Sequence, residues 1–521
     1  MSTDADPARD PASDTALEII AKGYAFTGPS LELGSLLWDG GCHPDFPIRI
    51  PLCMLNRHGL VAGATGTGKT KTLQLIAEQL SAAGVPVFLA DIKGDVSGIS
   101  APGAPGDRVT RRAAEVGRPW ALAAFPAEFY ALGGMGTGIP LRATVTSFGP
   151  VLMSKVLGLN PTQEQSLGLI FHYADTKGLE LTDLKDLRAV VTFLTSDAAG
   201  KAELKSIGGI SPATAGVILR TLTAFEAQGA GTFFGEPEFD TSELLRTAPD
   251  GRGIVSVLEL PEVQDRPQLF STFLMWLLAD LFEDLPEVGD LDKPKLVFFF
   301  DEAHLLFSGA SKAFLTAITQ TVRLIRSKGV GIFFVTQTPK DVPSDVLAQL
   351  GNRVQHALRA FTPDDAKALR ATVQTFPKSP YDLAAVLPAL GTGEAVVTVL
   401  SETGAPTPVA ATRLRAPQSL MGPLDPTALT TAVTGSPLHA RYAQAIDRES
   451  AYEKLTSKPA PKPAPAKPRP EEPKPAEPEP GVIEQVVHSG VFKSLARSVG
   501  TQLGREITRS LFGTAKRSRR R

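Results

Sequence analysis

The sequence of 521 residues predicts an α/β fold built around a mostly parallel β-sheet. The first observation is that short apolar runs alternate with longer segments of helical periodicity. The second is that the runs at 59–62 and 296–300 are apolar throughout, as is typical of parallel strands covered on both faces. The third is a glycine-rich stretch at 63–70, which joins one such run to a helical pattern.

The glycine-rich stretch matches the phosphate-binding pattern G-x-x-x-x-G-K-[ST] at every fixed position. Its glycines let consecutive N–H groups point inward at phosphate oxygens, and the following helix adds its positive N-terminal end. Lys69 then places a charge on the β- and γ-phosphates, and the Thr70 hydroxyl is placed to hold Mg²⁺. A chance glycine-rich turn is the weaker alternative. The predicted nucleotide-binding residues are Gly63, Ala64, Thr65, Gly66, Thr67, Gly68, Lys69 and Thr70, with Lys71 beside them.

Two acids, Asp301 and Glu302, directly follow the apolar run at 296–300. Open α/β sheets bind ligands at the carboxyl ends of their strands, so we expect Asp301 beside the phosphate loop, where it holds Mg²⁺ through water. Glu302 is then positioned to polarise an attacking water, which predicts hydrolysis rather than binding alone. The alternative is a buried strand that ends in two solvated acids.

Another apolar run, at 84–91, also ends in an acid. The same rule predicts that Asp91, together with Lys93 and Asp95 in the next loop, faces the nucleotide cleft. We therefore include Asp91 among the nucleotide-binding residues. A solvated turn explains these three residues equally well.

The spacing of the motifs predicts a core with a large insertion, because 230 residues separate Thr70 from Asp301. We expect further strands at 253–258, 330–337, 354–359 and 394–400, and helices at 267–282 and 311–327. The predicted parts are a disordered start at 1–15, a small segment at 16–50, the core at 51–150 and 251–415, a helical insertion at 151–250 and a helical extension at 416–456.

The last part of the chain changes character. Residues 457–481 are rich in proline and predict an extended linker. Residues 482–521 hold nine Lys and Arg against two Glu, a net charge of +7, in a weakly amphipathic pattern. This basic tail is expected to contact nucleic acid, an acidic membrane surface or a partner protein. A disordered solubilising end is the alternative.

Composition excludes several classes of protein. A formal net charge of −2 means that any DNA binding must come from local patches. Two cysteines, Cys42 and Cys53, form neither a disulfide framework nor a zinc pattern. We find no apolar run long enough to span a membrane and no signal peptide, so we expect a cytoplasmic protein.

Taken together, five motifs resemble the YjgR-like group of HerA-type ATPases, within the HerA/FtsK class of P-loop motors. The resemblance covers about residues 50–415 and rests on the segments 57–70, 88–95, 300–304, 326–337 and 350–354. It implies a RecA-like core that binds ATP, with Glu302 as the catalytic acid beside Asp301 and with Gln337 as the sensor of the γ-phosphate.

The resemblance also implies a hexameric ring acting on DNA, in which an arginine of one subunit enters the next subunit's site. Arg326 lies where related motors place this arginine, and Arg323 and Arg353 are the alternatives. About 50 residues precede the core, too few for the N-terminal β-barrel of the archaeal DNA-repair members. Two other functions stay open, a protein-remodelling ATPase and a nucleotide-dependent scaffold with slow or no turnover.

Overall fold

The computed structural model describes residues 11–263, 266–307 and 312–456. The chain divides into two compact units. The first comprises the residues up to Leu141 together with Phe239–Gln444, and the second comprises Arg142–Glu238 together with the residues after Gln444.

The first unit contains one sheet whose strands are parallel from β10 to β6 and antiparallel from β10 to β2. This arrangement confirms the predicted α/β class with a mostly parallel sheet. In spatial order the strands are β2 (Gly41–Pro51), β1 (Ser30–Trp38), β12 (Ala410–Leu414), β11 (Glu394–Thr398), β10 (Asn352–His356), β3 (Gly59–Ala62), β9 (Val330–Thr336), β8 (Leu296–Phe300), β4 (Val87–Asp91), β7 (Val255–Glu259), β5 (Ala127–Leu132) and β6 (Ile139–Leu141).

The central strands are buried at every position, which is why they appear in the sequence as unbroken apolar runs. β8 and β9 pair in register, and the rings of Phe299 and Phe333 stack with their centroids 5.2 Å apart. Because these strands are parallel, their carboxyl ends all meet at one edge of the sheet.

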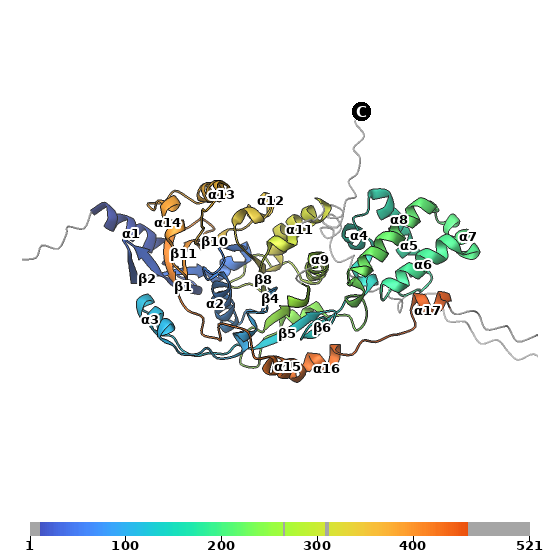
Figure 1. The fold of residues 1–521 in the computed structure, drawn as a ribbon, viewed down its shortest axis with the longest axis horizontal. Coiled ribbons are helices and arrows are strands. Elements are labelled where there is room, and N and C mark those ends of the chain that lie inside the picture. The colour runs from blue at the N-terminus through green and yellow to red at the C-terminus, as the bar shows by residue number, and fades with distance from the viewer. Residues whose placement is uncertain (1–10, 264–265, 308–311, 457–521) are drawn as a thin grey trace, which may run out of the picture. The chain divides into compact units, whose positions relative to one another are not determined.

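Helices cover both faces of this sheet; Figure 1 shows α11, α12 and α13 on one side and α2, α15 and α16 on the other. The helices of the first unit are α1 (Pro11–Gly23), α2 (Lys69–Ala82), α3 (Asp107–Val116), α9 (Pro267–Asp284), α10 (His304–Phe307), α11 (Lys312–Ile325), α12 (Ser344–Leu347), α13 (Pro363–Val373), α14 (Leu383–Ala389), α15 (Pro426–Gly435) and α16 (Pro437–Tyr442).

The N-terminal segment differs from the prediction. Residues 11–15, expected to be disordered, open α1 instead, and residues 1–10 lie outside the described part. The residues at 30–51 do not stand apart as a small segment, because β1 and β2 extend the main sheet through β12. β2 contains Pro44 and Pro47, and these prolines hide the strand pattern in the sequence. β2 lies at the edge of the sheet, where proline is tolerated.

The second unit is helical. Its helices are α4 (Val145–Val156), α5 (Pro161–Thr176), α6 (Leu184–Ser196), α7 (Ala198–Ser206), α8 (Pro212–Ala227) and α17 (Ala451–Thr456). Asn160 and Gln163 form a capping box at the start of α5, and Asp183 and Asp186 form one at the start of α6. The insertion runs from Arg142 to Glu238 rather than over the predicted 151–250, so it begins earlier, and the residues from Phe239 onward belong to the first unit.

Among the described residues, none of the helices combines the length and the apolar character needed to cross a lipid bilayer. The predicted linker at 457–481 and basic tail at 482–521 lie outside the described part of the chain.

Candidate functional site

The glycine-rich loop between β3 and α2 is anchored to both neighbouring strands. The Gly63 N–H donates to the Thr336 carbonyl at 3.2 Å, and the Ala64 N–H donates to the Ala357 carbonyl at 2.8 Å. A Cβ atom at Gly63 would lie 2.4 Å from the Cβ of His356, so only glycine fits there. Gly68 caps α2 with φ of 111°, in the left-handed region that favours glycine.

Lys69 points into this loop. Its ammonium donates to the Ala64 carbonyl at 3.1 Å, and the Thr67 hydroxyl donates to the same oxygen at 2.7 Å. Burial lowers the pKa of Lys69, whereas the nearby charge of Glu302 opposes that shift and the charge of Lys93 adds to it. The predicted P-loop lysine and the predicted catalytic glutamate therefore lie within electrostatic reach of each other.

Asp301 and Glu302 leave β8 at the same edge of the sheet, and both are buried. Burial raises the pKa of Asp301 to about 7, although the charge of Lys93 opposes the shift. One Asp301 oxygen, Oδ1, accepts the Glu302 N–H at 2.9 Å, and Oδ2 has no hydrogen-bond partner among the described residues. Glu302 has φ of 46°, a strained value for a residue with a side chain.

Glu302 has a cationic partner that the sequence did not reveal. Lys93, in the loop after β4, forms an ion pair and hydrogen bond with Glu302 Oε1, and His304 Nδ1 lies 3.3 Å from Oε2. Burial lowers the pKa of Lys93, but the hydrogen bond to Glu302 and the charges of Asp301, Glu302 and Asp95 together outweigh burial, so the pKa is raised overall. β4 and β8 are neighbouring parallel strands, so the loops that follow them lie close together at the carboxyl edge of the sheet. This placement does not predict that Lys93 pairs with Glu302.

Asp91 shapes the loop that carries Lys93. Its two carboxylate oxygens accept the N–H groups of Lys93 at 3.2 Å, Gly94 at 2.8 Å and Val96 at 2.8 Å. These bonds make Asp91 a loop-forming residue; a direct contact with nucleotide stays a prediction. Glu259, an acid that the sequence analysis missed, ends the adjacent strand β7, where burial and the charge of Asp91 raise its pKa to about 8.

His356 is a second residue that sequence reasoning missed. It ends β10, and its Nε2 lies 2.9 Å from the Thr72 hydroxyl in the first turn of α2. Burial lowers the pKa of His356 to about 4, and the charge of Lys69 adds to the shift. A neutral imidazole therefore packs beneath the phosphate loop.

The predicted sensor lies near the loop. Gln337 follows β9, the strand between β3 and β8, and its side chain is exposed. Asp301, Glu302 and Gln337 thus share the edge of the sheet that holds the phosphate loop.

The three candidate arginines do not lie beside the phosphate loop of their own chain. Arg326, in the short helix η6 (Arg326–Lys328), precedes β9, and that seven-residue strand spans roughly 23 Å. Arg326 is exposed at the edge opposite the chain's own phosphate loop. Arg323 is exposed on α11, and Arg353 donates to the carbonyls of Leu350 and Thr375.

The Asp301 carboxylate fits a magnesium ligand, and Thr70, the other predicted ligand, lies at the start of α2 beside Lys69. The unpartnered Asp301 Oδ2 is a buried carboxylate oxygen, and Mg²⁺ prefers oxygen ligands and commonly uses one or two carboxylates plus phosphates. In the described part of the chain, no group of three or more His, Cys, Asp or Glu forms a metal cage. A site completed by phosphate oxygens agrees with this donor set.

The chain is similar to several known proteins. The probable helicase MJECL08 of Methanocaldococcus jannaschii is 30% identical over 150 residues, which span 27% of this chain and 28% of that protein. The unbound bacterial conjugative coupling protein TrwBdeltaN70 superposes with a TM-score of 0.50 at 14% identity, covering 78% of this chain and 93% of that one. TrwB bound to the ATP analogue ADPNP gives the same four values. These two structures confirm the RecA-like P-loop fold.

A family model described as "Helicase HerA-like C-terminal" matches residues 40–521. This match covers the phosphate loop, the Asp301–Glu302 pair and the strands that bring them together. The chain is therefore a P-loop NTPase that belongs to the HerA family.

Proposed function

We propose that this protein is an Mg²⁺-dependent ATPase. The observation that supports the proposal is the convergence of Lys69, Asp301 and Glu302 at the carboxyl edge of one parallel sheet. These residue types, in this arrangement, neutralise phosphate charge and activate water.

Each residue has a separate part in hydrolysis. The loop N–H groups and Lys69 hold the phosphates, and Glu302 accepts a proton from the attacking water. Gln337 orients that water or the γ-phosphate. A magnesium ion held by Thr70 and Asp301 would neutralise the charge that develops on the phosphate oxygens. Lys93 holds the Glu302 carboxylate in place beside the loop.

We further propose that the protein works as a ring, with six subunits favoured, that moves along DNA. Membership of the HerA family supports DNA as the substrate. The position of Arg326 supports a ring, because this exposed side chain cannot reach the phosphate loop of its own chain. A neighbouring subunit would receive it.

The test is ATP hydrolysis with and without duplex or single-stranded DNA at fixed salt, with light scattering on the same samples. We expect Lys69→Ala to abolish nucleotide binding and Glu302→Gln to bind ATP without turning it over. The exposed changes Lys367→Ala and Glu287→Gln are the matched controls. Hydrolysis at the wild-type rate by the Glu302→Gln protein would contradict the assigned role.

The same assay separates the two other functions. Turnover stimulated by unfolded polypeptide but not by DNA would favour a protein-remodelling ATPase. Tight ATP binding with no turnover under any condition would favour a scaffold.

A further inference from the structure

Phe361 is the most exposed large apolar side chain in the described part of the chain. It is 87% exposed, and the next such side chain, Ile19, is 56% exposed. Single exposed apolar residues are common on protein surfaces, so exposure alone does not mark a contact site. Two further features do so here: the structured loop that carries the ring, and an apolar hollow on the opposite edge of the sheet.

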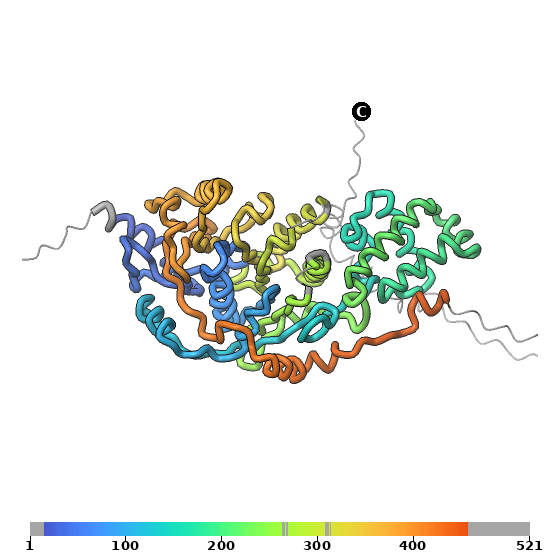
Figure 2. The backbone as a smooth tube through the Cα atoms, in the orientation of Figure 1, coloured from blue at the N-terminus to red at the C-terminus, as the bar shows by residue number. Residues whose placement is uncertain are grey.

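The loop that carries Phe361 is fixed at both ends. At one end, the N–H of the buried Leu358 donates to the Leu387 carbonyl at 3.3 Å. At the other end, the Asp365 carboxylate accepts the Phe361 N–H at 3.2 Å and the Thr362 N–H at 2.9 Å, next to the capping box that opens α13. Figure 2 shows the orange backbone of α13 on the outer surface of the first unit. The ring is therefore displayed outward by ordered backbone.

This loop is also joined to the phosphate loop. It follows β10, and the carbonyl of Ala357, the first residue after that strand, accepts the Ala64 N–H at 2.8 Å. Because β10 and β3 are neighbouring parallel strands, the two loops leave the sheet at the same, carboxyl edge. Neighbouring strands lie about 4.8 Å apart, so the loop of Phe361 begins about one strand spacing from the phosphate loop.

A wide hollow of about 820 Å³ lies at the opposite, amino edge of the same sheet. Two of its lining residues, Pro86 and Pro294, come just before β4 and β8. Its apolar lining also includes Leu245, Leu285 and Leu291. The hollow is therefore roomy and apolar enough to receive an aromatic side chain.

The wall of this hollow is bonded to the turn that carries Arg326. The Lys328 ammonium donates to the Leu285 carbonyl at 2.8 Å, and the Val288 N–H donates to the Ser327 carbonyl at 2.9 Å. β9, which follows this turn, pairs with β8, which follows lining residues of the hollow. The hollow thus begins about one strand spacing, roughly 4.8 Å, from the turn of Arg326.

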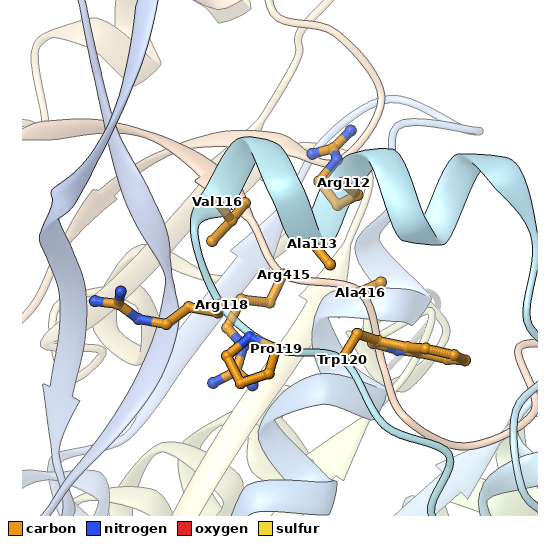
Figure 3. A pocket seen from close by; sticks show the side chains of 8 residues that line it. All are labelled: Arg112, Ala113, Val116, Arg118, Pro119, Trp120, Arg415 and Ala416. Atoms are coloured by element: carbon orange, nitrogen blue, oxygen red, sulfur yellow. The ribbon is translucent and has the colours of Figure 1, made fainter.

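Two other hollows lined by described residues do not suit an aromatic ring from another copy of the chain. Figure 3 shows one of them, between α3 and the chain at Arg415 and Ala416. It encloses about 10 Å³, which is room for about one water molecule. The other, lined by Gly68 and Thr72, opens beside the phosphate loop, on the same edge of the sheet as Phe361.

Charge favours a protein partner over nucleic acid at Phe361. Asp364 and Asp365 lie in the first turn of α13, directly after it, and their carboxylates repel phosphate groups. The rim of the hollow carries charges of both signs, from Asp284, Asp292, Lys293 and Lys295. The lysines of this rim complement the acids beside Phe361.

We propose that Phe361 inserts into this hollow on the next subunit, as the apolar anchor of a head-to-tail contact between copies of this chain. The inference rests on the proposed ring and adds the surfaces that join its subunits. A ring on one edge and a hollow on the opposite edge do not meet within one chain, but repeated copies satisfy both. The same contact carries Arg326 toward the neighbouring phosphate loop, because Arg326 adjoins the hollow and the phosphate loop adjoins Phe361.

The test is cross-linking of the full chain with Mg²⁺ and AMP-PNP, in a background that carries Cys42→Ser and Cys53→Ser. Chains with Phe361→Cys are mixed with chains that carry Asp292→Cys, an exposed position in the lining of the hollow. We expect a short bismaleimide to join the two variants into covalent dimers and to join neither variant to itself. Ile19→Cys, exposed on α1, takes the place of Phe361→Cys in the matched control and should give no dimers.

Three results of this experiment would overturn the contact. The first is a mixture without dimers, and the second is equal dimer formation with the Ile19→Cys control. The third is efficient dimer formation by Phe361→Cys alone, which would indicate that two copies meet through the same face.

Truncation of the ring separates this contact from the wider proposal. Phe361→Ala should raise the protein concentration at half-assembly about tenfold or more in light scattering, and Ile19→Ala should not change it. Calorimetry with AMP-PNP should give the wild-type affinity for both variants, because their phosphate loops are intact. Unchanged assembly of Phe361→Ala, with or without a loss of DNA binding, would overturn the contact and leave the ring standing. A wild-type protein that stays monomeric with AMP-PNP and DNA would overturn both.

Discussion

At the scale of single residues, Glu302, the predicted catalytic acid, is held in place by its surroundings. Its backbone lies in the left-handed region, its side chain is buried, and its carboxylate is held by Lys93 from a loop 209 positions away in the sequence. Strained backbone persists only where the surroundings over-determine it, and such places cluster at active sites. The pairing with Lys93 is one part of those surroundings.

Substitution of Lys93 therefore tests whether this residue positions the Glu302 carboxylate. Lys93→Met removes the partner of Glu302, so we expect hydrolysis to slow by about 10- to 100-fold through misplacement of the carboxylate, with ATP affinity nearly unchanged. Lys93→Arg restores a cation and should recover part of the rate. Steady-state kinetics and calorimetry measure the two effects, and an unchanged rate in Lys93→Met would contradict the positioning role.

His58 predicts how stability responds to acid. Its Nδ1 accepts the Ile332 N–H at 3.0 Å and its Nε2 lies 2.6 Å from the Val322 carbonyl, so the neutral ring donates through Nε2. Burial, with smaller contributions from the charges of Arg326 and Arg57, lowers its pKa to about 4. Between pH 6.5 and pH 4, His58 binds a proton in the unfolded chain but stays neutral in the folded chain. The free energy of unfolding therefore falls as the pH drops through this window.

Between pH 7 and pH 5, His58 should cost the folded state about 2 kcal/mol. We expect His58→Gln to lose less stability than wild type over this interval, because glutamine takes up no proton. Thermal melting at both pH values measures the difference, and the exposed His172→Gln is the control. An identical pH dependence in His58→Gln and wild type would refute the prediction.

At the scale of elements, α2 does more than support the phosphate loop. Its first turn meets His356 of β10 through Thr72, and its later turns hold the segment 415–421, the strap, through Gln74 and Glu78. One helix therefore connects the phosphate loop, the neighbouring strand and the strap. A shift of any one of these segments should therefore displace the others through α2.

Glu78 tests this connection. Glu78→Ala leaves the partly buried Gln418 N–H, the buried Ser419 N–H and the Ser419 hydroxyl without their acceptor, which should cost about 3 kcal/mol of stability. Glu78→Gln keeps one acceptor oxygen and should cost less. Thermal melting ranks the two variants, with the exposed change Glu287→Ala as the reference. If Glu78→Ala melts like wild type, the strap is held by other contacts.

At the scale of the whole molecule, the direction of the parallel strands separates two sets of predicted site residues. The phosphate loop, the acids and Gln337 lie at the carboxyl edge of the sheet, and Arg326 lies at the opposite edge. The arginine that we propose for this role can therefore reach only the site of another subunit. Such a head-to-tail contact closes into a ring when the rotation per subunit allows it.

Mixing of variants tests this arrangement. Arg326→Ala should bind ATP but turn it over slowly, and Lys69→Ala should be inactive by itself. In an equal mixture, a subunit with an intact loop meets a neighbour with an intact arginine at about a quarter of the interfaces, so activity should return to about that fraction. An inactive mixture would contradict the proposed role of Arg326 in the neighbouring subunit's site. The same experiment with Arg323→Ala or Arg353→Ala would then identify the arginine that has this role.

The sequence by itself determined the class of fold, the phosphate loop and the acids of β8, because these depend on local patterns. A buried parallel strand needs an apolar run, and a phosphate loop needs glycine at fixed positions. The local pattern did not predict β1, β2, β5, β6 and β12. These strands are short or lie toward the sheet edges, where prolines and polar residues dilute the pattern.

Only the tertiary structure decided which distant segments meet. The Lys93–Glu302 pair, His356 beneath the loop and the strap held by Glu78 join residues more than 200 positions apart. Such contacts follow from the order of the strands in the sheet, and strand order is set by the packing of the whole core. No local periodicity encodes it.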